Sequence, residues 1–168
     1  KPADEKWIVS AGRLVPWKGM NTLIEIMPAI VKEIPGVRLK IIGNGPEMKK
    51  LIQKVEQYNM QYAVELLGNL SHEKTLAYIK SADVFVLNSG YEGLSHVLLE
   101  AISCGVPVLA SRSGGNPEIL RSENLFDYND KEQIKELILK MLALTINENK
   151  NLAKQEGLIL GTEYSSGI

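Results

Sequence analysis

Residues 84–110, VFVLNSGYEGLSHVLLEAISCGVPVLA, decide the fold. The stretch opens with an apolar run at 84–87 and closes with a second apolar run at 106–110. Between them, residues 95–104 carry apolar side chains at helical spacing and end at Gly105, and glycine commonly terminates helices. A strand that is apolar on both faces is typical of a parallel sheet covered by helices. The stretch therefore predicts a strand–helix–strand unit.

The same alternation continues in both directions along the chain. Short runs rich in Val and Ile predict strands, and the longer amphipathic segments between them predict helices. Strands are predicted over 7–11, 37–42, 64–67, 84–87, 106–110 and 125–128, and helices over 20–34, 47–58, 72–81, 95–104, 117–120 and 130–144, the last with Asp130 as its N-cap. The fold class is thus α/β, a doubly wound parallel six-stranded sheet of the Rossmann type, with right-handed crossovers and the default strand order 3-2-1-4-5-6.

Length and composition indicate one domain, followed by a C-terminal segment with no clear packing partner. The chain has 168 residues, which suits a single domain. We assign 1–145 to the Rossmann-like domain and 146–168 to a C-terminal helix or linker, with a helix possible over 147–155 and a truncated end at Ile168. Because the chain begins at Lys1 rather than Met, we expect a fragment, a processed form or an excised domain.

Charge and hydropathy narrow the range of partners. The net charge of −1 provides no global attraction for nucleic acid or for an anionic membrane, so no nucleic-acid partner is expected. The single cysteine, Cys104, forms no disulfide within the chain, which fits a reducing compartment, and we expect a cytoplasmic protein. No signal peptide is visible, and no apolar run approaches the ~20 residues that span a bilayer.

Glycine follows five of the predicted strands. These loops are Gly12-Arg13, Gly43-Asn44-Gly45, Gly68-Asn69, 89–93 and 113–115. All of them fall at the carboxyl edge of the predicted sheet, where open α/β sheets bind ligands. Turn chemistry alone explains any one of these glycines, but together they favour a site in which backbone approaches a ligand closely.

Charged residues accompany these glycines. Arg13 and Lys18 share one loop, and two cations at the end of a strand suit a diphosphate. The helix that opens at Ser95 adds the partial positive charge of its N-terminus. Glu92 and Glu100 would accept hydrogen bonds from sugar hydroxyls, or serve as the carboxylates of acid–base chemistry. Solvated surface charges are the plainer explanation for all four side chains.

Metal ligands are not apparent in the sequence. There is no Asp-x-Asp motif and no pair of cysteines, and the two histidines, His72 and His96, are far apart. We expect His72 at the surface, Cys104 in packing, and a diphosphate charge met without a metal.

The motifs together resemble the carboxyl-terminal domain of retaining glycosyltransferases of the two-Rossmann (GT-B) architecture, family 4, also called glycosyltransferases group 1. The resemblance covers about residues 7–130 in the family's order. It is carried by Gly12-Arg13-Leu14-x-x-x-Lys18-Gly19, Ile42-Gly43-Asn44-Gly45-Pro46, Glu92-Gly93-Leu94-Ser95-x-x-Leu98-Leu99-Glu100-Ala101, 105–111 (GVPVLAS) and Gly114-Gly115-Asn116-Pro117-Glu118.

The resemblance implies a donor site for a nucleotide sugar such as a UDP-, GDP- or ADP-sugar, with no cofactor and no metal. Arg13, Lys18 and Glu92 would be its catalytic residues, the two cations on the diphosphate and leaving group and the carboxylate near the sugar. Glu100 would bind the ribose. The remaining donor-binding positions would be Gly12, Gly43, Asn44, Gly45, Pro46, Gly93, Leu94, Ser95, His96, Val97 and Glu118.

The family pattern extends beyond this chain. The resemblance implies an amino-terminal domain that binds the acceptor, a glycan or a lipid-linked sugar, and that is absent from these 168 residues. We therefore expect this chain to bind donor without transferring a hexosyl group. Any membrane association, at the cytoplasmic face, would come through the whole enzyme. Many members have Phe-Gly where this chain has Leu94-Ser95, and His96 is unusual.

Other functions stay open at this point. A nucleotide-sugar epimerase would convert the donor with no acceptor present. A phosphorylase would need a lysine for pyridoxal phosphate, which no motif here marks. A non-enzymatic nucleotide-binding module would bind its ligand independently of Arg13 and Lys18.

Overall fold

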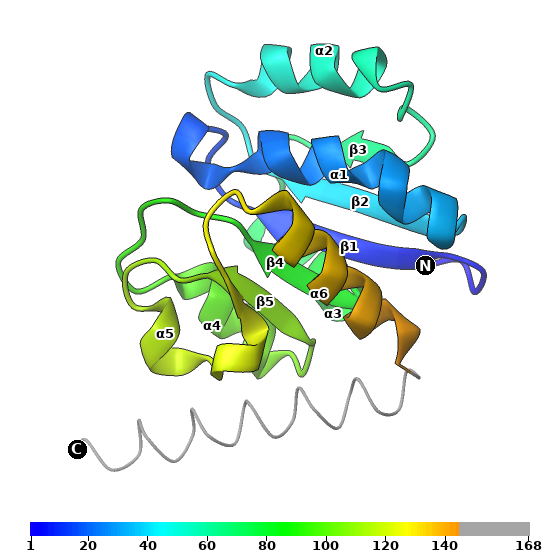
Figure 1. Cartoon of the computed structure of the whole chain (residues 1–168). Helices are drawn as coiled ribbons and strands as arrows, with labels where there is room; N and C mark the ends of the chain where they lie inside the picture. The colour runs from blue at the N-terminus through cyan, green and yellow to red at the C-terminus, as the bar shows by residue number, and fades with distance from the viewer. Residues whose placement is uncertain (145–168) are drawn as a thin grey trace.

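The computed structural model describes residues 1–144 and shows one six-stranded parallel sheet between two layers of helices (Figure 1). Its strand order is β3-β2-β1-β4-β5-β6, which confirms the predicted order and the doubly wound fold class. β1 lies at the centre, and Ile8 aligns with Leu39 of β2 on one side and with Val84 of β4 on the other. The order reverses at β1, so the loops after β1 and β4 flank the topological switch point.

The elements are close to those predicted. The strands are β1 (Lys6–Ala11), β2 (Val37–Ile42), β3 (Val64–Leu66), β4 (Val84–Leu87), β5 (Val108–Ser111) and β6 (Leu125–Phe126). The helices are α1 (Met20–Glu33), α2 (Met48–Gln57), α3 (His72–Ser81), α4 (His96–Ser103), α5 (Asn116–Ile119) and α6 (Lys131–Ala143). Two 3₁₀ turns, η1 (Pro16–Lys18) and η2 (Ser122–Asn124), were not predicted. The predicted segment 146–168, with its helix at 147–155, lies outside the described residues.

Several boundaries differ from the prediction for local reasons. Ser95 is the N-cap of α4 rather than its first residue, and its Oγ accepts a hydrogen bond from the N–H of Leu98. β5 begins at Val108 because Pro107 has no N–H to donate to the ladder, although its carbonyl still accepts from Phe85. Asp130 caps α6 as expected, since its carboxylate accepts from the N–H of Gln133.

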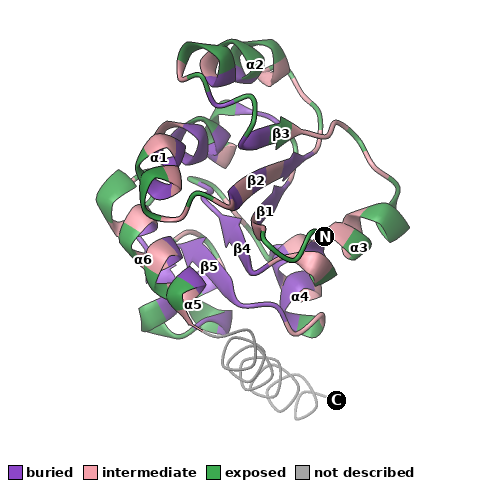
Figure 2. Ribbon diagram, turned by 90° about the vertical axis from the view of Figure 1, so that its right-hand side faces the viewer, coloured by how far each residue is buried: buried purple, intermediate pink, exposed green. Residues whose placement is uncertain are grey.

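Each face of the sheet has its own apolar core. Along β4, Val84 and Val86 join the cluster beneath α1, α2 and α6, whereas Phe85 and Leu87 join the cluster beneath α3, α4 and α5. All four side chains are buried, and burial follows the strands through the centre of the molecule (Figure 2). Burying both faces supplies the main stabilisation of the sheet, at roughly 1.5–3 kcal/mol for each large apolar side chain.

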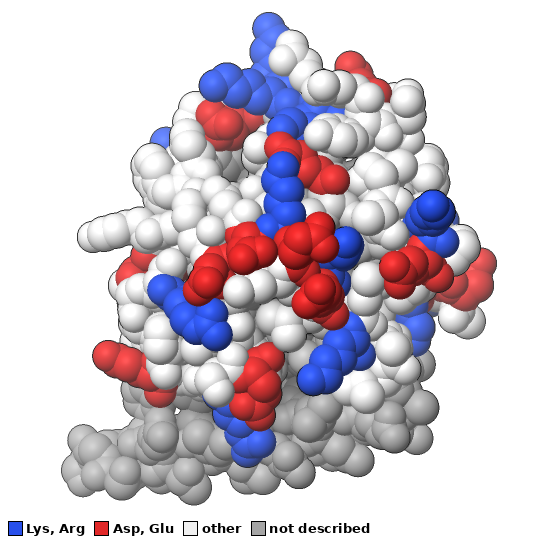
Figure 3. Space-filling model, in the orientation of Figure 1, with Lys and Arg blue, Asp and Glu red and all other residues white. Residues whose placement is uncertain are grey.

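The outer surface carries charges of both signs. Lys and Arg side chains alternate with Asp and Glu on the face that presents α1, α2 and α6 (Figure 3). This mixture agrees with the net charge of −1. Within residues 1–144, no helix combines the length and the hydropathy needed to cross a bilayer.

Candidate functional site

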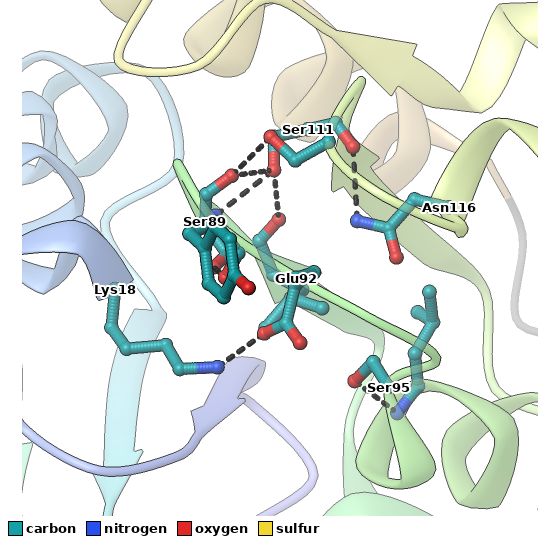
Figure 4. Close-up of polar contacts among 10 residues, drawn as sticks. Lys18, Ser89, Glu92, Ser95, Ser111 and Asn116 are labelled. Carbon is teal, nitrogen blue, oxygen red and sulfur yellow. Dashed lines mark hydrogen bonds and ion pairs between the residues drawn. The ribbon is translucent and has the colours of Figure 1, made fainter.

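The loops that follow β1 and β4 meet at the carboxyl edge of the sheet through an ion pair. Lys18, in η1, points its ammonium at the carboxylate of Glu92, 74 residues further along the chain (Figure 4). The lysine side chain is 19% exposed and the glutamate 10%, so solvent screens this pair less than an ordinary surface pair. The structure thus joins two of the three predicted catalytic residues.

Serine side chains hold the Glu92 loop in place. Ser111, at the end of β5, accepts a hydrogen bond from the N–H of Ser89 at 2.9 Å and donates one to the Ser89 carbonyl at 2.6 Å. Ser113 donates to the same carbonyl, and Ser89 donates to the carbonyl of Tyr91 (Figure 4). These contacts hold the loop on the amino side of Glu92, where Ser89 and Ser111 are buried, so buried polar groups fix the backbone that leads to Glu92. The sequence did not identify these serines.

The glycines divide into two kinds. A Cβ on Gly43 would lie 1.9 Å from the carbonyl oxygen of Gly12, and one on Gly114 would lie 1.5 Å from that of Glu92. A Cβ on Gly45 would likewise strike Leu14. These three are glycine because one loop packs against the next, and the close approach of their backbone to a ligand stays a prediction.

Gly93 is of the other kind. A Cβ there would meet nothing within 4 Å, and both Gly93 and Leu94 are exposed. The two residues lead into the N-terminus of α4, whose first N–H groups have no intrahelical partner. Ser95 caps the N–H of Leu98, and an anion at this helix N-terminus could be bound by the N–H groups of His96 and Val97, which precede the first intrahelical bonds.

A cleft of about 470 Å³ opens along the same edge, over β1, β2 and the start of α3. Of the predicted site residues, the cleft is lined by Gly12, Arg13, Gly43, Asn44 and Val97. It is also lined by Ala11, Ile42, Asn69, Leu70 and Thr75. Asn69 was noted only as part of a glycine loop, and no sequence signal marked Leu70 or Thr75, because β3 and α3 reach the cleft only through the folded sheet.

The other predicted residues lie outside this lining. Glu100, half-buried in α4, has its carboxylate 2.8 Å from Nε2 of His72 at the start of α3. Glu92 and Glu100 therefore have different partners rather than acting as one carboxylate pair. Glu118 and Pro46 are exposed, at α5 and before α2.

Two minor expectations are met. His72 is a surface residue, with 70% of its side chain exposed. Cys104 packs beside the core under α4, and burial raises the pKa of its thiol, which disfavours the reactive thiolate.

In the part of the chain that the structure describes, no three His, Cys, Asp or Glu side chains lie close enough together to bind a metal ion. A second hollow, of about 230 Å³, lies between α6 and Pro107, before the amino end of β5. It contains none of the predicted site residues.

Residues 1–156 match the family model described as glycosyl transferases group 1. The chain belongs to this family. Group 1 membership agrees with the motifs at the carboxyl edge of the sheet. The family match rests on sequence and makes no use of the cleft. The predicted roles of the individual site residues remain predictions.

Curated relatives are similar in sequence to this chain over part of their own length. The chain is 31% identical over 135 residues to the phosphatidylinositol N-acetylglucosaminyltransferase GPI3 subunit of Saccharomyces cerevisiae, covering 80% of this chain and 30% of that protein. It is 33% identical over 150 residues to the GDP-mannose-dependent alpha-(1-6)-phosphatidylinositol monomannoside mannosyltransferase of Mycolicibacterium smegmatis, covering 83% and 39%. The group 1 chain thus spans 30–39% of the length of these relatives.

Solved structures show the same architecture. The C-terminal domain of the group 1 protein LpcC from Francisella tularensis superposes with a TM-score of 0.82 at 26% identity, covering 95% of this chain and 86% of that one. Anabaena Alr3699/HepE, solved in complex with UDP and glucose, superposes with a TM-score of 0.83 at 22% identity, covering 94% and 44%. At that identity the second likeness shows the fold alone, the Rossmann-like half of a GT-B architecture.

Proposed function

We propose that this chain is the donor-binding half of a retaining, metal-independent glycosyltransferase that moves a hexosyl group from a nucleotide sugar to a glycan or a lipid-linked acceptor. The observation that carries the proposal is the Lys18–Glu92 pair, set between the open backbone at Gly93 and the cleft that Arg13 lines. We assign the donor site to the domain at 1–145.

The diphosphate would be bound by exchange of ion partners. Lys18 now pairs with Glu92, and an incoming diphosphate offers the lysine a more highly charged partner. Glu92 would then be free to accept hydrogen bonds from the hydroxyls of the donor sugar. Arg13 and the first N–H groups of α4 would take the remaining phosphate charge. As the bond to the sugar breaks, these donors would stabilise the charge that develops on the leaving nucleoside diphosphate.

The nucleoside would occupy the cleft. Its volume of about 470 Å³ and its mixed lining of Ile42, Leu70, Val97 and polar groups suit a base and a ribose. Glu100 would bind the ribose hydroxyls after parting from His72. The relatives suggest the probes, since one is named as GDP-mannose-dependent and a structural neighbour was solved with UDP.

The acceptor would be bound by the remaining part of a longer enzyme. Both curated relatives named above carry phosphatidylinositol in their names, which supports a lipid acceptor for the whole protein. Membrane association at the cytoplasmic face would then be a property of that whole enzyme.

The proposal is tested by calorimetric titration of the chain with UDP, GDP and ADP, with and without EDTA. One nucleotide should bind selectively, EDTA should not weaken it, and Arg13→Ala/Lys18→Ala should reduce its affinity by roughly a hundredfold or more, since each of the two charge-assisted contacts contributes about 1.5–3 kcal/mol.

The matched control is Lys32→Ala/Lys80→Ala, which removes two exposed cations in the last turns of α1 and α3, at the opposite edge of the sheet, and should leave affinity unchanged. Equal loss in both double variants would contradict a local diphosphate site. Binding that EDTA abolishes would contradict metal independence. No binding, in this chain and in the full-length protein alike, would refute the donor site itself.

A further inference from the structure

The backbone on both sides of Lys18 is tied to the loop that carries Glu92. The N–H of Gly90 donates to the carbonyl of Trp17 at 2.7 Å. The side-chain amide of Asn88 donates to the carbonyl of Gly19 at 3.0 Å. The two residues that flank Lys18 are therefore held from positions two and four residues before Glu92. The ion partners thus come from loops that are already joined.

Asn88 is itself held rigidly. It is fully buried, and its amide nitrogen also donates to Oδ1 of Asn129 at 2.8 Å. Its Oδ1 accepts from the N–H of Asn129 at 3.0 Å, and Thr22 of α1 donates to Asn129 Oδ1 at 2.8 Å. Because both ends of the Asn88 amide are engaged, one orientation is favoured over its flip. The side chain is locked against α1 and the loop before α6.

Asn88 and Gly19 pack so closely that there is no space for a side chain at residue 19. Gly19 has φ +59°, and a Cβ there would lie 2.2 Å from the side-chain nitrogen of Asn88 and 2.3 Å from the backbone carbonyl oxygen of Asn88. The chain therefore turns at Gly19 directly against Asn88. Lys18, one residue earlier, projects from a backbone whose position is set by this contact.

We propose that Asn88 is a positioning residue of the donor site, which places the Lys18 ammonium at the distance from Glu92 where a diphosphate can replace the carboxylate. This inference rests on the proposed function for its ligand, but its structural content, the placement of Lys18, stands alone. A shorter side chain would not reach Gly19, and a carboxylate would lose the donor. In either case the lysine loop loses the Asn88 bond and keeps the hydrogen bond from Gly90 to Trp17 and the longer one from Tyr128 to Pro16.

The test uses Asn88→Ser in the chain as it stands, with Asn129→Gly as the matched control. The control removes the side-chain oxygen of exposed Asn129 that accepts from Asn88, tolerates the φ of +61° at that position, and keeps the Asn88–Gly19 bond. Urea unfolding verifies that each variant is folded. If Asn88→Ser does not fold, Asn88→Asp replaces it, because it retains the size and the acceptor for Asn129.

The first readout is acetylation of lysines with limiting acetic anhydride, followed by peptide mass spectrometry. The rate at Lys18 should rise several-fold in Asn88→Ser and stay at the wild-type value in Asn129→Gly, while exposed Lys49 reacts equally in all three proteins. An unchanged Lys18 rate in Asn88→Ser, or an equal rise in the control, would overturn the proposal.

The second readout separates positioning from general loosening. Asn88→Ser should weaken the diphosphate (UDP or GDP, whichever the wild type binds) by about tenfold, and leave the matching monophosphate unaffected. In a Lys18→Ala background Asn88→Ser should have no further effect. Equal weakening of both nucleotides would overturn the positioning role. If neither this chain nor the full-length protein binds a nucleotide, the donor proposal fails, while the acetylation rates still decide the role of Asn88.

Discussion

Gly93 and Gly114 are neighbouring glycines with opposite requirements. The N–H of Gly115 donates to the carbonyl of Gly93 at 3.2 Å, so the loops after β4 and β5 touch here. Gly114 has φ +53° and no space for a side chain, whereas Gly93 faces open space. Sequence alone treats them alike, because the difference depends on atoms more than 20 residues away.

Gly114→Ala should therefore destabilise the fold. Its Cβ would displace the Glu92 carbonyl and would impose left-handed strain, at a cost of about 1–3 kcal/mol. Urea unfolding measures this loss. Wild-type stability in this variant would mean that the two loops are not packed as described.

Gly93→Ala is expected to act in the reverse way. The methyl group meets nothing in the free chain, so stability should change by no more than about 0.5 kcal/mol. If a ligand lies against this backbone, nucleotide affinity measured by calorimetry should fall. Unchanged affinity would place the ligand elsewhere.

Ser111 provides a further test at the residue scale. Ser111→Ala should cost about 1–3 kcal/mol, because the buried N–H of Ser89 loses its acceptor. The Ser89 carbonyl keeps Ser113 as a donor. The comparison is with Ser103→Ala, an exposed position on α4, which should be close to neutral in the same unfolding experiment.

At the scale of elements, one carboxylate joins three helices. Glu25 of α1 forms ion pairs with Lys54 of α2 and Lys131 of α6. Burial alone would raise the pKa of Glu25, but the hydrogen bonds and charges of Lys131 and Lys54 outweigh it and hold the pKa below its ordinary value of 4.5. A depressed pKa means that the folded state favours the ionised form.

Glu25→Gln should therefore lower stability at neutral pH by about 1 kcal/mol. The contribution is present above the unfolded pKa near 4.5 and disappears as the pH falls through the lower folded value. The gap between wild type and variant, from urea curves at pH 7 down to pH 3, should close in that window. Glu56→Gln, at an exposed position of α2, should show no such gap. A stability difference between wild type and Glu25→Gln that grows as the pH falls would mean that the pKa of Glu25 is raised on folding, not lowered.

Element boundaries show what local rules can and cannot supply. The caps Ser95 and Asp130 are determined by a few adjacent residues, so α4 and α6 begin within one residue of the prediction. The 3₁₀ turn η1 also has local signals, Pro16 at its first position and the left-handed Gly19 after its last residue, which the prediction did not use. It forms where Gly90 and Asn88, from another loop, bind its backbone and the residue after it.

At the scale of the whole molecule, residues 1–144 form one domain in which the Lys18–Glu92 pair and the cleft share the carboxyl edge of the sheet. We predict that residues 1–168 bind a nucleoside diphosphate and transfer no sugar. Incubation with labelled GDP-mannose or UDP-sugar and a phosphatidylinositol acceptor should give no product, whereas the full-length protein should. Robust acceptor-dependent transfer by this chain would refute the prediction that acceptor binding needs a further part of the enzyme. Label converted with no acceptor present would indicate an epimerase.

The sequence by itself determined the alternating strands and helices, the two helical layers and the edge of the sheet at which the glycine-bearing loops lie. Those features follow from periodic burial and from turn residues after parallel strands, which are local patterns, whereas the strand order was the default for this fold class and the structure decided it. Only the tertiary structure decided that Lys18 pairs with Glu92, that Glu100 contacts His72, and that Asn69 and Thr75 line the cleft. Such contacts join residues far apart in the chain. Their distances depend on how buried side chains such as Asn88 and Ser111 lock one loop to the next.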